Sequence, residues 1–385
     1  MVLLLIFLLP LFSIPFIFLV GRESKRKPGA IIVMFSVLDL ILLLSIVPEV
    51  LSKGKYMESY YWMPMLGAPL TLFADGVSLS LAAITLLLII SSVIFALDYM
   101  EDSKSLWQFY VLIALLTVGL VGVFITANLM IFYFCWEFML IPAYFIIGGW
   151  GYRESYRAAF KFFIFTHAGA VAVLLGIGAI YMLTGTLDIF QAKDLLAAAP
   201  QDFLKWIFIA LTLGFAVKMA IVPLHMWLPD AHAEAPAPMS ALLSGVIIEA
   251  GAYAILRVPL GTVFPLISDV SASNQILYTL SILGVLSAFY GAMTALAEND
   301  IKRIVAYSSI SHMGYALFGL SLYPCVEGIV GAVLHLVNHA ASKGLLFLNA
   351  GAIMKQTGAR DISKMGGLAS KMPITCLLYT SDAAD

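Results

Sequence analysis

Ionisable side chains occur near the middle of strongly apolar, membrane-length segments of this sequence. Lys218 and Glu249 lie in two such segments, on either side of a polar, proline-rich hinge, VPLHMWLPDAHAEAPAP. A charge at the centre of a bilayer costs at least ~2.5–3.5 kcal/mol, so such residues usually line a pathway or pair with each other. Small residues around Glu249 allow helices to approach closely. Glu249 is therefore a plausible partner for Lys218, in a static ion pair or in one whose protonation changes.

Other apolar segments carry single ionisable residues as well. Glu137 lies among aromatic and aliphatic residues in NLMIFYFCWEFMLIPAYF, and His312 follows a run of hydroxyls in YSSISH. Hydroxyl and imidazole groups both donate and accept hydrogen bonds, so this run can carry a proton wire or simply be hydrogen-bonded. Lys218 precedes Pro223 by about one turn, and a proline inside a membrane helix kinks or breaks it.

A polar stripe is predicted in the segment LHLVNHAASKGLLF, where His335, His339 and Lys343 recur every four residues. Four residues advance the direction of a helix by only ~40°, so the three side chains share one face. They cover ~12 Å along the helix axis. A stripe of this length must face protein or water. The two histidines alone supply no third metal ligand, which disfavours a metal site.

A line of protonatable groups at one membrane level is typical of a proton path, whereas static ion pairs would explain only two or three of these residues. The remaining polar residues have weaker interpretations. Asp39 receives no role, and His225, His232 and Glu234 in the hinge are interpreted as solvated or capping residues near one membrane surface. The predicted proton-translocation residues are Glu137, Lys218, Glu249, His312, His335, His339 and Lys343, with Pro223 at the helix break.

The elements that position these residues are membrane helices. The 385 residues are 62% hydrophobic and 11% charged, against ~25% charged in soluble proteins, which indicates an all-α polytopic membrane protein. A net charge of −2 gives no reason to expect nucleic-acid partners. Neither a GxGxxG motif after a strand, a P-loop nor a cysteine cluster is present, so we expect no nucleotide, flavin, iron–sulfur cluster or metal in this chain.

Apolar segments of about 20 residues predict eleven spans. With the N-terminus outside, 14 of the 21 basic residues lie in inward loops and 5 lie outside, as the positive-inside rule requires. The first segment lacks a basic n-region and reads as a helix rather than a signal peptide. Residues 186–201 predict a short amphipathic surface helix. The predicted spans are 2–20, 29–48, 77–97, 106–126, 129–149, 162–184, 204–222, 237–257, 276–296, 303–321 and 327–352.

The C-terminal residues break this pattern. We interpret residues 1–373 as a single membrane domain. The ending CLLYTSDAAD resembles the read-through translation of a sequencing adapter, so residues 374–385 are interpreted as a non-native tail on a C-terminally truncated chain.

Four motifs carry a family resemblance: FYFCWEFMLIPAYF, VPLHMWLPDAHAEAP, YSSISHMGY and RDISKMGGLASKMP. Over about residues 60–373 the chain resembles the antiporter-like membrane subunits of respiratory complex I, most closely the M-type, the counterpart of mitochondrial subunit 4. The resemblance implies a 14-helix fold with inverted repeats and a broken seventh helix. It also implies that Glu137 and Lys218 form a half-channel pair. His312 and His339 match histidines on the central axis of the family.

Two residues depart from the M-type pattern. M-type subunits usually have lysine where this chain has Glu249. A lysine at the position of Lys343 resembles the L- and N-type subunits and cation antiporter subunits more than the M-type. The resemblance implies a proton-translocating subunit of an NADH:quinone oxidoreductase in a prokaryotic inner membrane, beside L-, N- and K-type subunits. NADH, FMN, iron–sulfur clusters and quinone would then belong to partner subunits. The alternatives are a subunit of a multi-chain Na⁺/H⁺ antiporter, a membrane-bound hydrogenase or ferredoxin- or F420-linked complex, and a static membrane scaffold.

Overall fold

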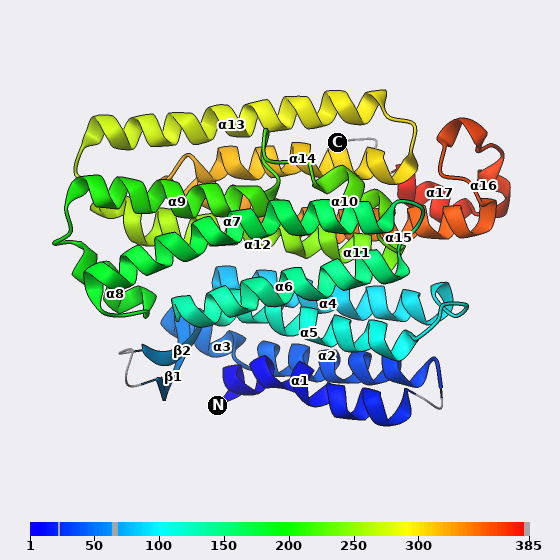
Figure 1. Ribbon diagram of the computed structural model, residues 1–385, viewed down its shortest axis with the longest axis horizontal. Coiled ribbons are helices and arrows are strands. Elements are labelled where there is room, and N and C mark those ends of the chain that lie inside the picture. Colours follow the sequence, from blue (N-terminus) through cyan, green and yellow to red (C-terminus); the bar gives the residue numbers. More distant parts are fainter. Residues whose placement is uncertain (22–23, 64–67, 381–385) are drawn as a thin grey trace.

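The computed structural model describes residues 1–21, 24–63 and 68–380. Arg22, one of the 14 basic residues predicted in inward loops, and residues 381–385 of the predicted non-native tail lie outside the described residues. Long helices run side by side along the longest axis, with α1 and α2 at one edge and α13 at the other (Figure 1). The all-α polytopic fold is confirmed, since nine helices of the described ranges are long and apolar enough to cross a membrane.

All eleven predicted spans are helical in the structure. Two of them, α9 and α14, are not among the nine because of the charges in α9 and the serines, histidine and basic residues in α14. The long helices are α1 (Val2–Val20), α2 (Lys27–Ser45), α4 (Gly76–Tyr99), α5 (Leu106–Ile125), α6 (Leu129–Trp150), α7 (Ser155–Thr184), α9 (Gln201–Met219), α13 (Val270–Ala297), α14 (Ile301–Leu320) and α15 (Val326–Thr357).

The eighth predicted span is a composite of short segments. It begins with α11 (Ala237–Leu242) and continues through a π-helical segment (Leu243–Ile247) into α12 (Ile248–Ile255). A second π-helical segment (Leu256–Val263) and a 3₁₀ turn (Phe264–Leu266) complete it. π-Helical turns inside membrane helices occur frequently at functional sites.

Short helices connect and flank the spans. They are α3 (Val47–Lys53), α8 (Ile189–Leu196), α10 (Leu228–Glu234), the 3₁₀ turn Ile362–Lys364, α16 (Leu368–Lys371) and α17 (Pro373–Thr380). The predicted surface helix within residues 186–201 is confirmed by α8, which begins where the Asp188 side chain accepts the amides of Phe190 and Gln191. Such caps satisfy amides that the helix itself leaves unpaired.

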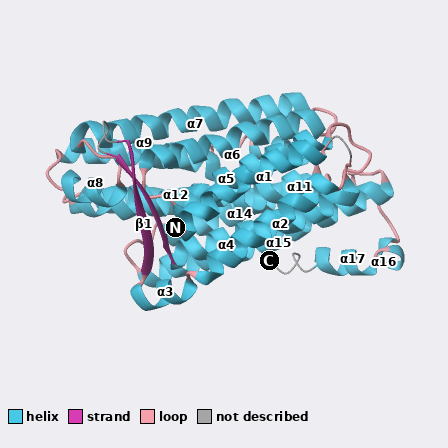
Figure 2. Cartoon of the chain, turned by 90° about the horizontal axis from the view of Figure 1, so that it is seen from below, coloured by secondary structure: helices cyan, strands magenta, loops and turns pink. Residues whose placement is uncertain are grey.

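A two-stranded antiparallel hairpin lies between the predicted spans 29–48 and 77–97, and hydropathy did not predict it. Its strands are β1 (Lys55–Met63) and β2 (Ala68–Asp75). The hairpin lies beside α3 at one end of the bundle, here called the hairpin end, and α16 and α17 lie at the opposite end (Figure 2).

Glu58 ties the hairpin to the first helix. Its carboxylate accepts the amides of Leu3 and Leu4, both at 3.2 Å, and the hydroxyls of Tyr56 and Tyr60. Burial opposes ionisation of this group. The hydrogen bonds from the N-terminal amine, Tyr60, the Leu4 amide and Tyr56 outweigh burial and lower the pKa of Glu58 to about 2.

The seventh helix is broken, as the resemblance implies. α9 ends at Met219, Ala220 adopts a left-handed conformation with φ 58°, and the helical direction resumes only at α10. The indole of Trp227 donates to the carbonyl of Val217 at 2.9 Å, and the Ser287 hydroxyl accepts the amide of Val222 at 3.0 Å. Side chains therefore satisfy backbone groups that a continuous helix would pair internally.

Candidate functional site

Lys218 lies at the end of α9, in the last turn before the break. Its side chain is buried with 1% exposed. The ammonium donates to the main-chain carbonyl of Trp136 at 3.0 Å and lies 4.0 Å from the centroid of the Trp136 ring. A carbonyl and an aromatic face both stabilise a cation without neutralising it. The Lys218 side chain is thus held against Trp136 of α6, the residue that directly precedes Glu137.

Glu137 interacts electrostatically with Lys218, but no ion pair within 4.0 Å joins the two described side chains. The Glu137 carboxylate lies close to His167 of α7, whose Nδ1 is 3.6 Å from Oε2, a contact that becomes an ion pair only when the imidazole is protonated. The structure therefore brings the pair implied by the resemblance into one region and inserts a third titratable group beside it.

His167 was missed by the sequence analysis. Its ring stacks on Phe163, one turn earlier in α7, with centroids 5.3 Å apart. The available signal was a single ionisable residue inside the predicted span 162–184, the same signal that identified His312.

The predicted pairing of Lys218 with Glu249 is wrong. Glu249 is fully buried in α12, and its Oε1 lies 3.0 Å from Nδ1 of His339 in α15. A Cβ added at Gly251 would meet the backbone of Met219, so this face of α12 contacts α9. Two residues rotate a helix by ~200°, so Glu249 projects from the opposite face, towards α15.

A histidine cluster, defined here as Glu249, His339, His312 and His335, joins α12, α14 and α15. Nδ1 of His312 lies 3.2 Å from Nε2 of His335, and the rings of His312 and His339 are 5.4 Å apart between centroids. The imidazoles therefore form a contiguous group with the Glu249 carboxylate at one end.

Lys343 lies one turn beyond His339 and is fully buried. Its ammonium donates to the Ser308 hydroxyl at 2.7 Å. Nearby in sequence, the hydroxyls of Ser309 in α14 and Ser244 in the π-helical segment lie 2.8 Å apart. The stripe of α15, which was predicted to face protein or water, faces protein, because each of its three members contacts a polar group on α12 or α14.

Of the two interpretations of His225, His232 and Glu234, as solvated or as capping residues, the first is wrong, since they are 4%, 0% and 7% exposed. α10 packs between α7 and α14 and is thereby buried. Nδ1 of His232 lies 2.9 Å from the Leu228 carbonyl. Lys302, assigned to an inward loop, is fully buried in the first turn of α14 and donates to the Ala235 carbonyl.

Arg360 closes the end of the bundle opposite the hairpin. Its guanidinium contacts Glu234 of α10 at 3.0 Å and Asp300, the N-cap of α14, at 2.8 Å. Burial alone would lower the pKa of Arg360, but the carboxylates of Asp300 and Glu234 outweigh it and raise the pKa. The charged form of Arg360 therefore fixes the broken helix to α14.

Lys161 and Arg303 both contact Asp230 of α10, at 2.7 and 2.6 Å. α10 is thus held by α7 and α14 as well as by Arg360. Over the ranges that the structure describes, no three histidine, cysteine or acidic side chains are placed to hold a metal ion.

Comparison with known proteins supports this arrangement. Residues 126–381 match the model of the family described as NADH:quinone oxidoreductase/Mrp antiporter, TM. The NADH-quinone oxidoreductase subunit M of Rickettsia felis is 35% identical over 382 residues, covering 96% of this chain and 75% of the relative.

Two solved structures are similar as well. An archaeal membrane-bound sulfane sulfur reductase, described as a respiratory membrane complex, contains a chain with a TM-score of 0.89 and 26% identity, covering 98% of this chain and 76% of that one. Respiratory complex I from Thermus thermophilus contains a chain with a TM-score of 0.82 and 26% identity, covering 99% of this chain and 78% of that one. This chain therefore belongs to the transmembrane family shared by NADH:quinone oxidoreductases and Mrp antiporters.

Proposed function

We propose that this chain is the M-type, proton-translocating membrane subunit of a complex I-type NADH:quinone oxidoreductase. The observation that carries the proposal is the buried ammonium of Lys218 at the end of a broken helix, held by the carbonyl and ring of Trp136 beside Glu137. Membership of the family and the likeness to a subunit M over 96% of the chain support it.

The proposed mechanism is electrostatic. The contacts of Lys218 with Trp136 are with neutral groups, so its protonation responds to the charge on Glu137. At an effective dielectric of ~20, two unit charges 4 Å apart interact by ~4 kcal/mol. Lys218 and Glu137 lie beyond that distance, so a change of charge on Glu137 shifts the proton affinity of Lys218 by a few kcal/mol at most. Such a shift suffices to bind and release a proton in turn.

The histidine cluster is proposed as the second part of the path. The imidazoles of His339, His312 and His335 can each pass a proton between their two nitrogens. Lys343 and the Ser308 hydroxyl continue the polar line one turn further along α15. When a proton reaches His339, the Glu249 side chain 3.0 Å away is placed to stabilise it. In this arrangement Glu249 takes the relay position that relatives of the M-type occupy with lysine.

The wider assignments belong to the same proposal. We infer that the redox centres, meaning NADH, FMN, iron–sulfur clusters and quinone, reside in partner subunits, and that this chain acts in the translocase as a membrane subunit without one. L-, N- and K-type subunits are its proposed neighbours. The proposed location is a prokaryotic inner membrane with the hairpin end outside, and residues 1–373 are assigned to one membrane domain.

Replacement of Lys218 tests the proposal directly. In the assembled complex, Lys218→Ala should abolish proton translocation while the subunits remain associated. Lys53→Ala, which removes an exposed lysine of α3, is the matched control and should pump normally. Proton uptake and electron transfer are measured in the same proteoliposomes. Normal pumping by the Lys218→Ala complex would contradict the assigned role.

A Na⁺/H⁺ antiporter subunit is the second candidate, because the matched family includes Mrp antiporters. Genes for NADH- or quinone-reacting subunits beside this one would favour the first proposal, and genes for small antiporter chains would favour the second. A static scaffold differs from both. Infrared difference spectra during turnover should show protonation changes at Lys218 and Glu249, whereas a scaffold would give none.

A further inference from the structure

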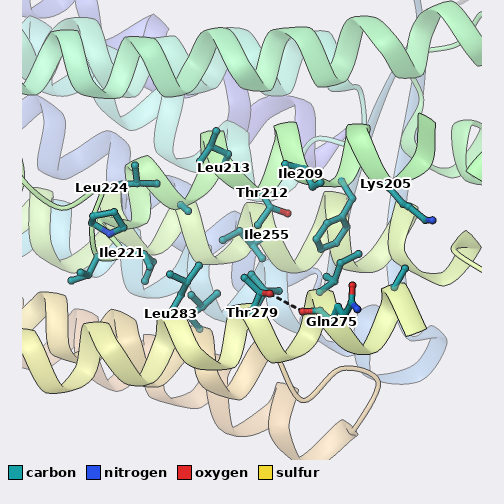
Figure 3. A pocket seen from close by; sticks show the side chains of 18 residues that line it. Lys205, Ile209, Thr212, Leu213, Ile221, Leu224, Ile255, Gln275, Thr279 and Leu283 are labelled. Atoms are coloured by element: carbon teal, nitrogen blue, oxygen red, sulfur yellow. Dashed lines mark hydrogen bonds between the residues drawn. The ribbon is translucent and has the colours of Figure 1, made fainter. Parts of the chain in front are cut away.

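An apolar groove of about 570 Å³ opens between α9 and α13. Figure 3 shows its two walls, with Thr212 on α9 towards Thr279 and Leu283 on α13, while Ile209 and Leu213 line the groove from further along the surface of α9. The groove is closed at its inner end by residues 221–224, which follow the break after Lys218. It therefore extends from the hairpin end of the bundle to the irregular backbone in the middle.

Polar groups gather at the mouth of the groove. Nζ of Lys205 lies 3.4 Å from Asp269 and 3.8 Å from Asp202, and the Gln275 side chain lies nearby on α13 (Figure 3). Amide donation from Ala272 and the Lys205 ammonium lower the pKa of Asp269. The mouth thus presents one ammonium between two carboxylates, and nearly all of the remaining lining is hydrocarbon.

The depth of the groove matches one leaflet of a bilayer. The lining residues span positions 205–216 on α9 and 272–283 on α13. At 1.5 Å per residue each wall is ~16 Å long, and the hydrocarbon core of a bilayer is ~30 Å thick. A chain that enters at the mouth therefore reaches the break near the middle of the membrane.

We propose that this groove binds one acyl chain of a phospholipid whose headgroup carries both a phosphate and a primary ammonium, as in phosphatidylethanolamine. The phosphate accepts hydrogen bonds from Lys205, and the lipid ammonium donates to Asp269 and Asp202. The acyl chain lies between Leu213 and Leu283 and ends against residues 221–224. This inference is independent of the role proposed for Lys218.

Other occupants fit the groove less well. A transmembrane helix is ~10–12 Å wide with its side chains and crosses the whole core, whereas this groove stops half-way. A lipid with only a negative headgroup would face two carboxylates and one ammonium. A choline headgroup has no N–H group to donate to Asp269.

A bound acyl chain would also solve a problem created by the break. Non-helical backbone is tolerated at membrane depth only where it is covered by protein or lines a water-filled cavity. Residues 221–224 line the groove, and Pro223 among them is exposed. An ordered chain at this position covers the break and keeps water away from it.

Photo-crosslinking tests the proposal with the complete chain in its complex. The complex is reconstituted with trace phosphatidylethanolamine, phosphatidylcholine or phosphatidylglycerol, each carrying the same photoreactive group near the end of one acyl chain. Phosphatidylethanolamine should label residues 221–224 or 279–283 about threefold to fivefold more than the other two lipids, because Asp202 and Asp269 are solvent-exposed and ion pairs of exposed groups contribute little more than such a factor.

Three variants separate specific binding from ordinary lipid contact. Leu283→Trp fills the groove and should abolish the labelling, whereas Leu286→Trp, on the exposed side of the same helix, should leave it unchanged. Asp269→Asn keeps the N-cap of α13 and should remove the preference over phosphatidylcholine. Equal labelling by all three lipids, or labelling that survives Leu283→Trp, would identify ordinary boundary lipid. A preference for phosphatidylglycerol, or one unchanged by Asp269→Asn, would overturn the headgroup assignment.

Discussion

A single added methyl group at Gly251 should uncouple this subunit without unfolding it. Gly251 lies in α12, where the helix meets the end of α9. A Cβ at this position would lie 2.7 Å from the amide nitrogen and 2.9 Å from the Cβ of Met219. Met219 follows Lys218 directly, so any displacement at this contact moves the end of the helix that carries the proposed proton-binding ammonium.

The size of the displacement follows from the contact distances. Restoring an ordinary carbon contact of ~3.5–4.0 Å requires a movement of ~0.5–1 Å. Overpacking of this kind costs ~1–3 kcal/mol, and the better helix propensity of alanine returns ~1 kcal/mol. The net loss of stability should therefore be ~2 kcal/mol or less. A misplacement of ~1 Å can reduce a rate by ~10²-fold, so function should suffer far more than folding.

The assay compares Gly251→Ala with Gly178→Ala in the assembled complex. Gly178 lies in α7, and an added Cβ there meets no atom within 4 Å, so this control gains helix propensity without a clash. Proton translocation and electron transfer are measured in proteoliposomes, and the melting temperature is measured on the same samples. We expect Gly178→Ala to pump normally and Gly251→Ala to lose most of its pumping with a small change in melting temperature.

Two outcomes would refute this reasoning. If Gly251→Ala pumps like the control, the contact between α9 and α12 does not position Lys218. If Gly251→Ala lowers the melting temperature strongly as well as pumping, the loss of pumping reflects general destabilisation instead of a displaced ammonium.

Three further predictions concern the charged groups outside the proposed proton path. Folding lowers the pKa of Glu58 from 4.5 to about 2. The stabilisation of the hairpin by Glu58 is therefore present above pH 4.5 and is lost as the pH falls towards 2. Glu58→Gln should remove this pH dependence in a proteolysis assay. Arg360→Ala leaves Glu234 and Asp300 without the guanidinium that contacts both, and should destabilise the complex by ~3 kcal/mol. Arg360→Lys should restore only part of this stability in thermal unfolding. A full rescue by lysine would refute the simultaneous contact of Arg360 with both carboxylates. Asp39 is fully buried, and within the described residues neither of its carboxyl oxygens has a hydrogen-bond partner, so Asp39→Leu should raise stability by ~1–3 kcal/mol; a loss of pumping in this variant would show that Asp39 has a function.

Two kinds of information about this protein were accessible from the order of its residues. The lengths of the apolar segments predicted every long helix, because a bilayer requires about 20 residues per span. The four-residue spacing of His335, His339 and Lys343 predicted their common face, because helical periodicity is a local property. The hairpin was missed, since hydropathy identifies the segments that cross the membrane and says little about the structure of the residues between them.

The partners of the buried charges were decided only by the tertiary structure. Glu249 seemed the natural partner of Lys218 because the two residues lie in neighbouring segments, yet it contacts His339, which is 90 positions away. The rotation of α12 about its axis makes this choice. That rotation depends on the close contact of Gly251 with Met219 and on the packing of α12 among other helices, which hydropathy and spacing do not report. The apolar pattern thus determined which residues lie inside the membrane, and the packing of the helices determined which of them meet.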